Sequence, residues 1–269
     1  MITPPVGRLG LLALAHAALW LGLNRSLPWP ERLGAYGAAV RSAATPDTWA
    51  TVLPEIVLTG TYVLLGTLLS WALVGVLRRM RPGSLWVLET VPPFLLLVLM
   101  LALGLAVTVP RGWTFPLSPW APLMLFVFAG SLAVPVAARA ALQGLGAFRD
   151  AWAAPYTRAA RAMGLPEARL SARAWAVARP VAVHTLAGES LNVVFSLTVL
   201  EGLLQFPGVG NTVYQAVQAT LGGPVAAGST DEGALVIALA ALIALGAVAG
   251  GVQRRAAHHL DARPPLGDT

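Results

Sequence analysis

The sequence TVLPEIVLTGTYVLLGTLLSWALVGVL, residues 51–77, contains one charged side chain, that of Glu55, in an otherwise uncharged and mainly apolar run. A helix that crosses the hydrocarbon core of a bilayer needs about 20 mainly apolar residues. The run therefore predicts a membrane-spanning helix. Comparable stretches recur at residues 85–109, 121–138, 185–205 and 233–252. Their number predicts an all-α polytopic membrane protein.

A sixth apolar stretch, residues 6–23, is shorter and carries His16. Arg8 stands before its apolar part, as the basic residue of a signal peptide would. No small-residue cleavage site follows, only the sequence NRSLPWPER, so we expect the stretch to remain as a helix. The sequence thus predicts six transmembrane helices.

The composition narrows the functions that this chain can perform. Of its 269 residues, 57% are hydrophobic and 11% are charged, whereas soluble domains carry about 25% charged residues. The chain has no cysteine, which excludes disulfides, thiol nucleophiles and thiolate metal sites. All 18 basic residues are arginine, so the chain has neither the lysine of a P-loop nor that of a Schiff-base enzyme. We expect a non-catalytic protein without a metal or cofactor of its own, in which any ATP is hydrolysed by another subunit.

The arginines also predict the topology. If the N-terminus is cytoplasmic, 14 of the 18 arginines fall on the cytoplasmic side and four fall outside. This distribution obeys the positive-inside rule, so both termini and residues 139–184 are expected to be cytoplasmic. The net charge of +6 then follows from topology, and no nucleic-acid partner is expected.

Residues 139–184 form a long insertion with seven arginines between the fourth and fifth spans. From Pro155 the pattern is helical, because apolar residues recur at intervals of three and four up to Met163. Gly164 suits the C-terminal cap of such a helix. A short amphipathic helix of this kind can rest on lipid headgroups or contact a partner protein, and the pattern alone leaves both open.

Three sequences in this half of the chain resemble one family. YTRAARAMGL at residues 156–165, VLEGLLQFPGVGN at 199–211 and LDAR at 260–263 are similar to motifs of permease subunits of binding-protein-dependent ABC importers. The likeness is greatest to the dipeptide, oligopeptide and nickel branch. The Arg-Asp pair that this branch carries before its P-V-x-x-G sequence is missing from LGGPVAAG, residues 221–228. The exact subfamily and the substrate therefore stay open.

The resemblance implies a type I ABC importer permease of one domain, residues 1–269, in a bacterial inner membrane. Its partners would be membrane lipid, a second permease subunit that differs from this chain, two ATPase subunits holding ATP and Mg²⁺, and an extracytoplasmic solute-binding protein. The substrate would be a peptide or a similar small solute. The helix in the cytoplasmic segment would be a coupling helix that docks in a groove of the ATPase subunit, and the sequence after the fifth span would be an external gate. The implied coupling residues are Tyr156, Arg158, Ala159, Ala160, Arg161, Ala162 and Gly164, and the implied gate residues are Glu201, Phe206, Pro207, Gly208 and Gly210.

Polar residues recur within two of the spans. The fifth span carries Thr185, Glu189, Asn192 and Ser196. Their spacing of four, three and four places them on one helical face, where they can line a translocation path or hydrogen-bond neighbouring helices. The second span carries the row Glu55, Thr59, Tyr62, Gly66 and Ser70, which we expect to pack against the fifth span or a partner.

The alternative class of protein is a secondary transporter with Glu189 as its coupling carboxylate. Six spans without an inverted repeat do not favour it. The proline pair Pro92-Pro93 predicts a kink in the third span. Each histidine is interpreted as a structural polar residue and not as a metal ligand.

Overall fold

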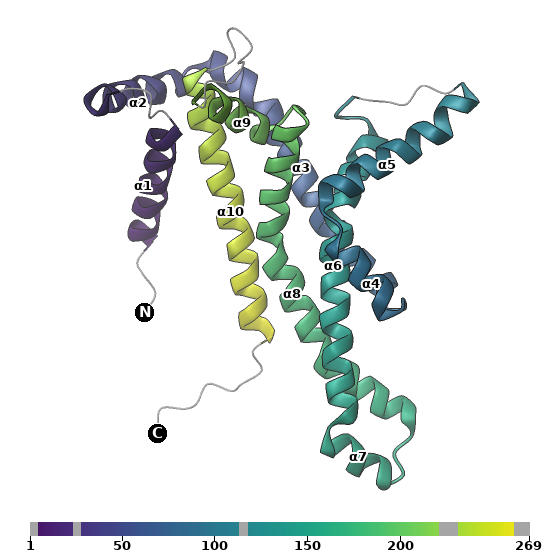
Figure 1. Ribbon diagram of the computed structural model, residues 1–269. Helices are drawn as coiled ribbons and strands as arrows, with labels where there is room; N and C mark the ends of the chain where they lie inside the picture. The colour runs from purple at the N-terminus through teal and green to yellow at the C-terminus, as the bar shows by residue number, and fades with distance from the viewer. Residues whose placement is uncertain (1–4, 24–27, 113–117, 221–230, 261–269) are drawn as a thin grey trace, which may run out of the picture. The chain divides into compact units, whose positions relative to one another are not determined.

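The computed structural model describes residues 5–23, 28–112, 118–220 and 231–260, with the backbone alone at 5–11, 220 and 256–260. All regular structure in these ranges is helical (Figure 1). The tail motif at 261–263 and the segment 221–228 lie outside the described residues. The helices are α1 (Pro5–Leu23), α2 (Trp29–Ala43), α3 (Pro46–Leu77), α4 (Pro82–Thr90), α5 (Pro93–Thr108), the 3₁₀ turn η1 (Val109–Arg111), α6 (Pro122–Ala153), α7 (Pro155–Ala162), α8 (Glu167–Leu203), α9 (Val209–Thr220) and α10 (Glu232–Leu260).

Five of these helices are long and apolar enough to cross a membrane, as expected of a polytopic helical membrane protein. They are α3, α5 with η1, α6, α8 and α10. The described apolar part of α1, Leu12–Leu23, is shorter, so the sixth span stays a prediction.

Two compact units share the chain. The first unit comprises Met1–Val63 and Val194–Ala247, and the second comprises Leu64–Val193 and Val248–Thr269. Helices α3, α8 and α10 each contribute one end to each unit. The single permease domain stays a prediction.

The first unit has a core of buried side chains from α1, α2, α3, α9 and α10. Trp20 and Val52 are buried with small residues of α2 such as Ala39. His16 is half-buried and hydrogen-bonded, because its ring nitrogens lie 2.9 Å from the Tyr36 hydroxyl and 2.9 Å from the carbonyl oxygen of Val236. These contacts agree with a structural role for this histidine.

The second unit is organised around α6, the most deeply buried of the spanning helices. Small residues on α6 let its neighbours approach closely. A Cβ atom added to Gly144 would lie 3.1 Å from the Cβ atom of Ala182 on α8. Buried alanines of α6, including Ala137 and Ala141, pack with Leu77 and Leu85.

The third predicted span, residues 85–109, is not one helix. Helix α4 ends at Thr90, Val91 and Pro92 are extended with ψ angles of 120° and 142°, and α5 begins at Pro93. Two consecutive prolines remove two backbone donors, and each disfavours the helical conformation of the residue before it. The pair therefore breaks the helix where a kink was expected.

The predicted cytoplasmic loop, residues 139–184, is also largely helical. Helix α6 continues to Ala153 and α8 already begins at Glu167. The arginines there end the apolar pattern, but alanine and arginine are both strong helix formers. The membrane-spanning pattern and the helix therefore end at different residues, and the connection between the two long helices is 154–166.

Candidate functional site

Helix α7 lies between the ends of α6 and α8, at the place where the sequence predicted a short amphipathic helix (Figure 1). Pro155 occupies its first turn, where the missing N–H has no helical partner to lose. Thr157 and Ala160 are buried, and the Thr157 hydroxyl donates a 2.7 Å hydrogen bond to the carbonyl oxygen of Ala151. This bond ties α7 to the last turn of α6.

The rest of α7 is exposed. Tyr156 and Met163 are 55% and 73% exposed, and Ala159 lies on the same stripe. The remaining exposed coupling residues of the prediction are Arg158, Arg161, Ala162 and Gly164. Of the predicted apolar face, only Ala160 packs against the protein. The stripe of Tyr156, Ala159 and Met163 is available to a partner or to lipid.

The end of α7 has the hydrogen bonds of a Schellman motif. The N–H of Gly164 donates to the carbonyl oxygen of Arg161 at 3.0 Å, and that of Leu165 donates to the carbonyl oxygen of Ala160 at 3.1 Å. Gly164 has a φ of +81°, a left-handed conformation that glycine adopts without steric cost. The prediction of a glycine cap at this position is confirmed.

Within the second unit, a series of aromatic and cationic contacts links α7 to α6 and α8. The Arg161 guanidinium lies 4.9 Å from the centre of the Trp152 ring. Trp152 stacks on Phe148, and the Phe148 ring centre is 4.7 Å from that of Trp175 on α8. Arg161 therefore has a contact within its own chain, which the sequence did not reveal.

Three of the four residues assigned to a translocation path are hydrogen-bonded within the second unit. The Thr185 hydroxyl donates to the side-chain oxygen of Gln143 at 2.5 Å. Asn192 donates to Glu189 at 2.6 Å. Ser196 is half-buried on the part of α8 that belongs to the first unit. The Thr185 bond to α6 agrees with the alternative of hydrogen bonds that hold the bundle together, whereas the Asn192 bond lies within α8.

Glu189 also belongs to an ion-paired cluster. Arg139 on α6 donates through Nη1 to Glu189 at 2.5 Å and through Nε to Glu89 on α4 at 2.9 Å. One guanidinium thus joins three helices through two carboxylates, a geometry that its planar fork permits. The pairing of Arg139 with Glu89 could not be predicted, because nothing in their spacing along the chain links them.

The predicted gate residues form a compact turn in the first unit. The Glu201 carboxylate is fully buried. It accepts a 2.7 Å hydrogen bond from the Thr59 hydroxyl and a 2.8 Å hydrogen bond from the N–H of Gly210. The N–H of Val209 donates in turn to the Thr59 oxygen at 3.1 Å. Glu201 and Thr59 therefore fix the start of α9 against α3.

Because the glycines of this turn have no side chain, the Glu201 carboxylate can occupy the space beside them. A Cβ atom on Gly208 would lie 2.3 Å from the carboxyl carbon of Glu201, and one on Gly210 would lie 2.4 Å from the carbonyl oxygen of Thr198. Such distances are far below van der Waals contact, so any larger residue must displace the chain. The close approach explains the Gly-x-Gly spacing after Pro207.

The polar row on α3 is accounted for by contacts. Thr59 and Tyr62 contact the turn after α8, the latter through the Phe206 ring at 6.3 Å between ring centres. Glu55 accepts a 2.8 Å hydrogen bond from Thr212 on α9. A Cβ on Gly66 would lie 3.6 Å from Val193 of α8. The expected packing of this row against the fifth span is confirmed for Thr59 and Gly66.

Among the described residues, no three histidine, aspartate or glutamate side chains are grouped closely enough to hold a metal ion. His258 and His259 have no described side chains. No protein-family model, curated protein or solved structure matches the chain. Its function is therefore inferred from its own residues and geometry.

Proposed function

We propose that this protein is the permease subunit of a binding-protein-dependent ABC importer in a bacterial inner membrane. The observation that carries the proposal is α7. It is an eight-residue helix, capped by Gly164, bonded to α6 through Thr157, and exposed along Tyr156, Ala159 and Met163. A helix fixed to its own chain on one side and open on the other is suited to receive force from a partner subunit.

In this proposal α7 couples the ATPase subunit to the spans. Small alanines allow close approach in a groove, and the arginines pair with acidic groups of the ATPase. Because α7 is tied to α6 by a hydrogen bond and to Trp152 by a cation–π contact, movement of α7 is transmitted to the long helices. The chain holds no nucleotide, and a second permease subunit, two ATPases and an external binding protein complete the importer for a peptide or similar solute.

The secondary-transporter alternative has less support. It requires Glu189 to bind and release a coupling ion. The carboxylate already accepts hydrogen bonds from Arg139 and Asn192. A coupling ion would have to displace the guanidinium that already occupies this carboxylate.

The proposal is tested in the reconstituted importer with Gly164→Leu. A branched side chain at a φ of +81° costs about 1 kcal/mol or more of local strain and misplaces α7. Transport and binding-protein-stimulated ATP hydrolysis should fall while membrane insertion is kept. Gly146→Leu, at an exposed position of α6, is the matched control, because an added Cβ there meets nothing within 4 Å. If transport and ATP hydrolysis stayed coupled as normal in Gly164→Leu, the proposed role of α7 would be wrong. The helix would then be an interfacial element that contacts only lipid headgroups.

The arginines separate contact with a partner from contact within the chain. Arg158→Glu should weaken ATPase-subunit association in a salt-dependent manner. Trp152→Leu should affect only the internal stack, and Arg161→Glu should combine both defects. Equal association of all three variants with the ATPase would contradict a docking role for α7.

The absence of cysteine allows the topology to be measured directly. Single cysteines at positions 158 and 258 should react with an impermeant thiol reagent only after the membrane is opened. Labelling of either position in intact cells would overturn the proposed orientation.

A further inference from the structure

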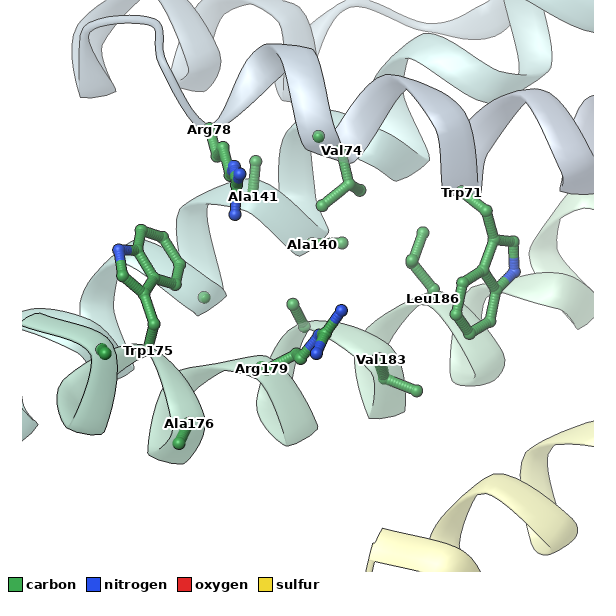
Figure 2. A pocket seen from close by; sticks show the side chains of 14 residues that line it. Trp71, Val74, Arg78, Ala140, Ala141, Trp175, Ala176, Arg179, Val183 and Leu186 are labelled. Atoms are coloured by element: carbon green, nitrogen blue, oxygen red, sulfur yellow. The ribbon is translucent and has the colours of Figure 1, made fainter.

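The second unit contains a cavity of about 660 Å³ between the C-terminal part of α3, the middle of α6 and the cytoplasmic part of α8 (Figure 2). Alanines and Gly144 form much of its wall, and Trp71 and Trp175 lie at its two ends in this view. No residue of α7 or of the turn at 201–210 lines this cavity.

Two guanidinium groups point into the cavity from opposite walls. Arg78 extends from the end of α3 and Arg179 extends from α8 (Figure 2). The cavity lining contains no carboxylate. In the described part of the chain, neither arginine forms an ion pair. Two cations that face one space without a counter-charge favour an anionic occupant.

One of the two guanidiniums is held in place by an aromatic ring. Arg78 lies 5.4 Å from the centre of the Trp175 ring, and Trp175 is packed against Phe148. The contact orients the guanidinium without neutralising it, because a ring face carries no net charge. The cation therefore remains available to an anion.

The cavity also lies where the chain passes from apolar to charged sequence. Arg78 directly follows Leu77, the last residue of α3, and Arg179 precedes the apolar part of α8. Arginine and tryptophan are the side chains that gather at the boundary of a bilayer. Basic pockets between spanning helices on the cytoplasmic side suit the headgroups of acidic lipids.

We propose that this cavity binds the headgroup of an anionic phospholipid. The phosphate lies between Arg78 and Arg179, and the apolar part of the lipid follows the alanine wall and Trp71. A lipid fits better than a soluble phosphate ester, because most of the lining offers apolar contact and no hydrogen-bond donor. The cavity is of the size of small-molecule sites, about 300–1,000 Å³.

The test is binding to the purified full chain in a neutral detergent, measured by native mass spectrometry. The probes are dioctanoyl phosphatidylglycerol, dioctanoyl phosphatidylcholine and glycerol 3-phosphate. The anionic lipid should bind at least tenfold more tightly than either of the others. Competition by glycerol 3-phosphate at concentrations equal to the lipid would show a site for soluble phosphate esters and overturn the proposal.

Two kinds of variant locate the site. Arg78→Gln with Arg179→Gln should weaken binding of the anionic lipid at least tenfold. The control, Arg79→Gln with Arg173→Gln, removes the same charge outside the cavity and should change binding less than twofold. Equal losses in both double variants would show diffuse attraction of headgroups and would overturn the proposal.

Filling the cavity tests the same site without changing its charge. Gly75 lines the cavity, and a Cβ atom added to it meets nothing within 4 Å. Gly75→Leu should therefore keep the melting temperature of the protein and lower affinity for the anionic lipid at least tenfold. Unchanged affinity in this folded variant would overturn the proposal, whatever the stability of the arginine variants.

Discussion

Glu189 and Glu201, the two carboxylates in the apolar part of helix α8, lie twelve residues apart and have surroundings that differ in kind. Glu189 is partly exposed, with 13% of its side chain accessible, and is paired with the guanidinium of Arg139. Glu201 is fully buried, and its hydrogen bonds come from neutral donors, the Thr59 hydroxyl and the backbone of Gly210. The same type of side chain thus forms an ion pair in the second unit and fixes a turn by hydrogen bonds in the first.

The difference shows that the role of an intramembrane carboxylate depends on its donors. A guanidinium partner makes the interaction electrostatic, so it responds to charge and ionic strength. When the donors are neutral, the strength of the interaction depends on hydrogen-bond geometry. The effect of a substitution then depends on whether the new side chain keeps the shape and the acceptor atoms of the carboxylate. Variants of the two sites should therefore fail in different ways.

The largest effect is expected from Gly210→Ala. Its methyl group would lie 2.4 Å from the Thr198 carbonyl oxygen and 2.7 Å from the Thr198 Cα atom. Backbone atoms of a packed helix cannot move aside cheaply, so we expect a loss of about 3 kcal/mol or more. Thermal unfolding in detergent measures it. Gly60→Ala on α3, where the added atom meets nothing within 4 Å, should be neutral or slightly stabilising.

Glu201→Leu should have the next largest effect. It leaves the Gly210 N–H and the Thr59 hydroxyl without their acceptor, at about 1–3 kcal/mol for each buried group. Glu201→Gln keeps the shape of the side chain and one acceptor oxygen for the Gly210 N–H, while its NH2 group can donate to the Thr59 oxygen, so it should cost about 1 kcal/mol. If both substitutions proved equally damaging, the negative charge itself would be required and the contrast with Glu189 would fail.

A double-mutant cycle between Arg139 and Glu189 should give a moderate coupling energy. Combining Arg139→Gln with Glu189→Gln should yield about 1–2 kcal/mol of coupling, smaller in about 1 M salt than in dilute buffer. The matched cycle of Thr59→Val with Glu201→Gln should not depend on salt. If the coupling energy between Arg139 and Glu189 did not change with salt, the pair would behave like the neutral hydrogen bonds of Glu201, and the proposed contrast would be wrong.

The smallest effect is expected at Gln205, which ends α8 in a left-handed conformation with a φ of +50°. Its N–H donates to Gly202 and that of Phe206 donates to Glu201, so it occupies the position that Gly164 holds after α7. Gln205→Gly should stabilise the protein by about 0.5–1 kcal/mol, and Gly164→Ala should destabilise it by a similar amount. Shifts of the same sign would show that the two caps are not equivalent.

Local features of the fold could be predicted from the sequence. Helix α7 begins at the expected Pro155, and Gly164 caps it, because both signals act within one turn. Hydropathy located the spanning segments but not the ends of α6 and α8, since alanine and arginine continue a helix after the apolar pattern stops. The hydropathy pattern predicted no helix between residues 24 and 50, yet α2 forms there around buried alanines.

The partners of the polar side chains could not be predicted in the same way. Glu201 was recognised as important, but its donor Thr59 is 142 residues away along the chain. The Arg139 cluster joins residues 50 positions apart in each direction. Such pairs depend on how helices pack, and a single sequence carries no periodic signal for them. The spacing on α8 places the four polar residues on one helical face, but their hydrogen-bond partners depend on the packing of neighbouring helices.

The order of the helices has a consequence for how the protein is made. Helix α8 is the least apolar of the five spanning candidates, and a carboxylate within a span opposes insertion, most strongly near the centre of the bilayer. Glu201 and Glu189 find side-chain partners on helices that precede α8, Thr59 on α3 and Arg139 on α6. When α8 leaves the ribosome, these donors are already synthesised, so we expect the earlier helices to assist its entry into the bilayer. The Gly210 donor follows later, and its arrival locks a segment that is already in place.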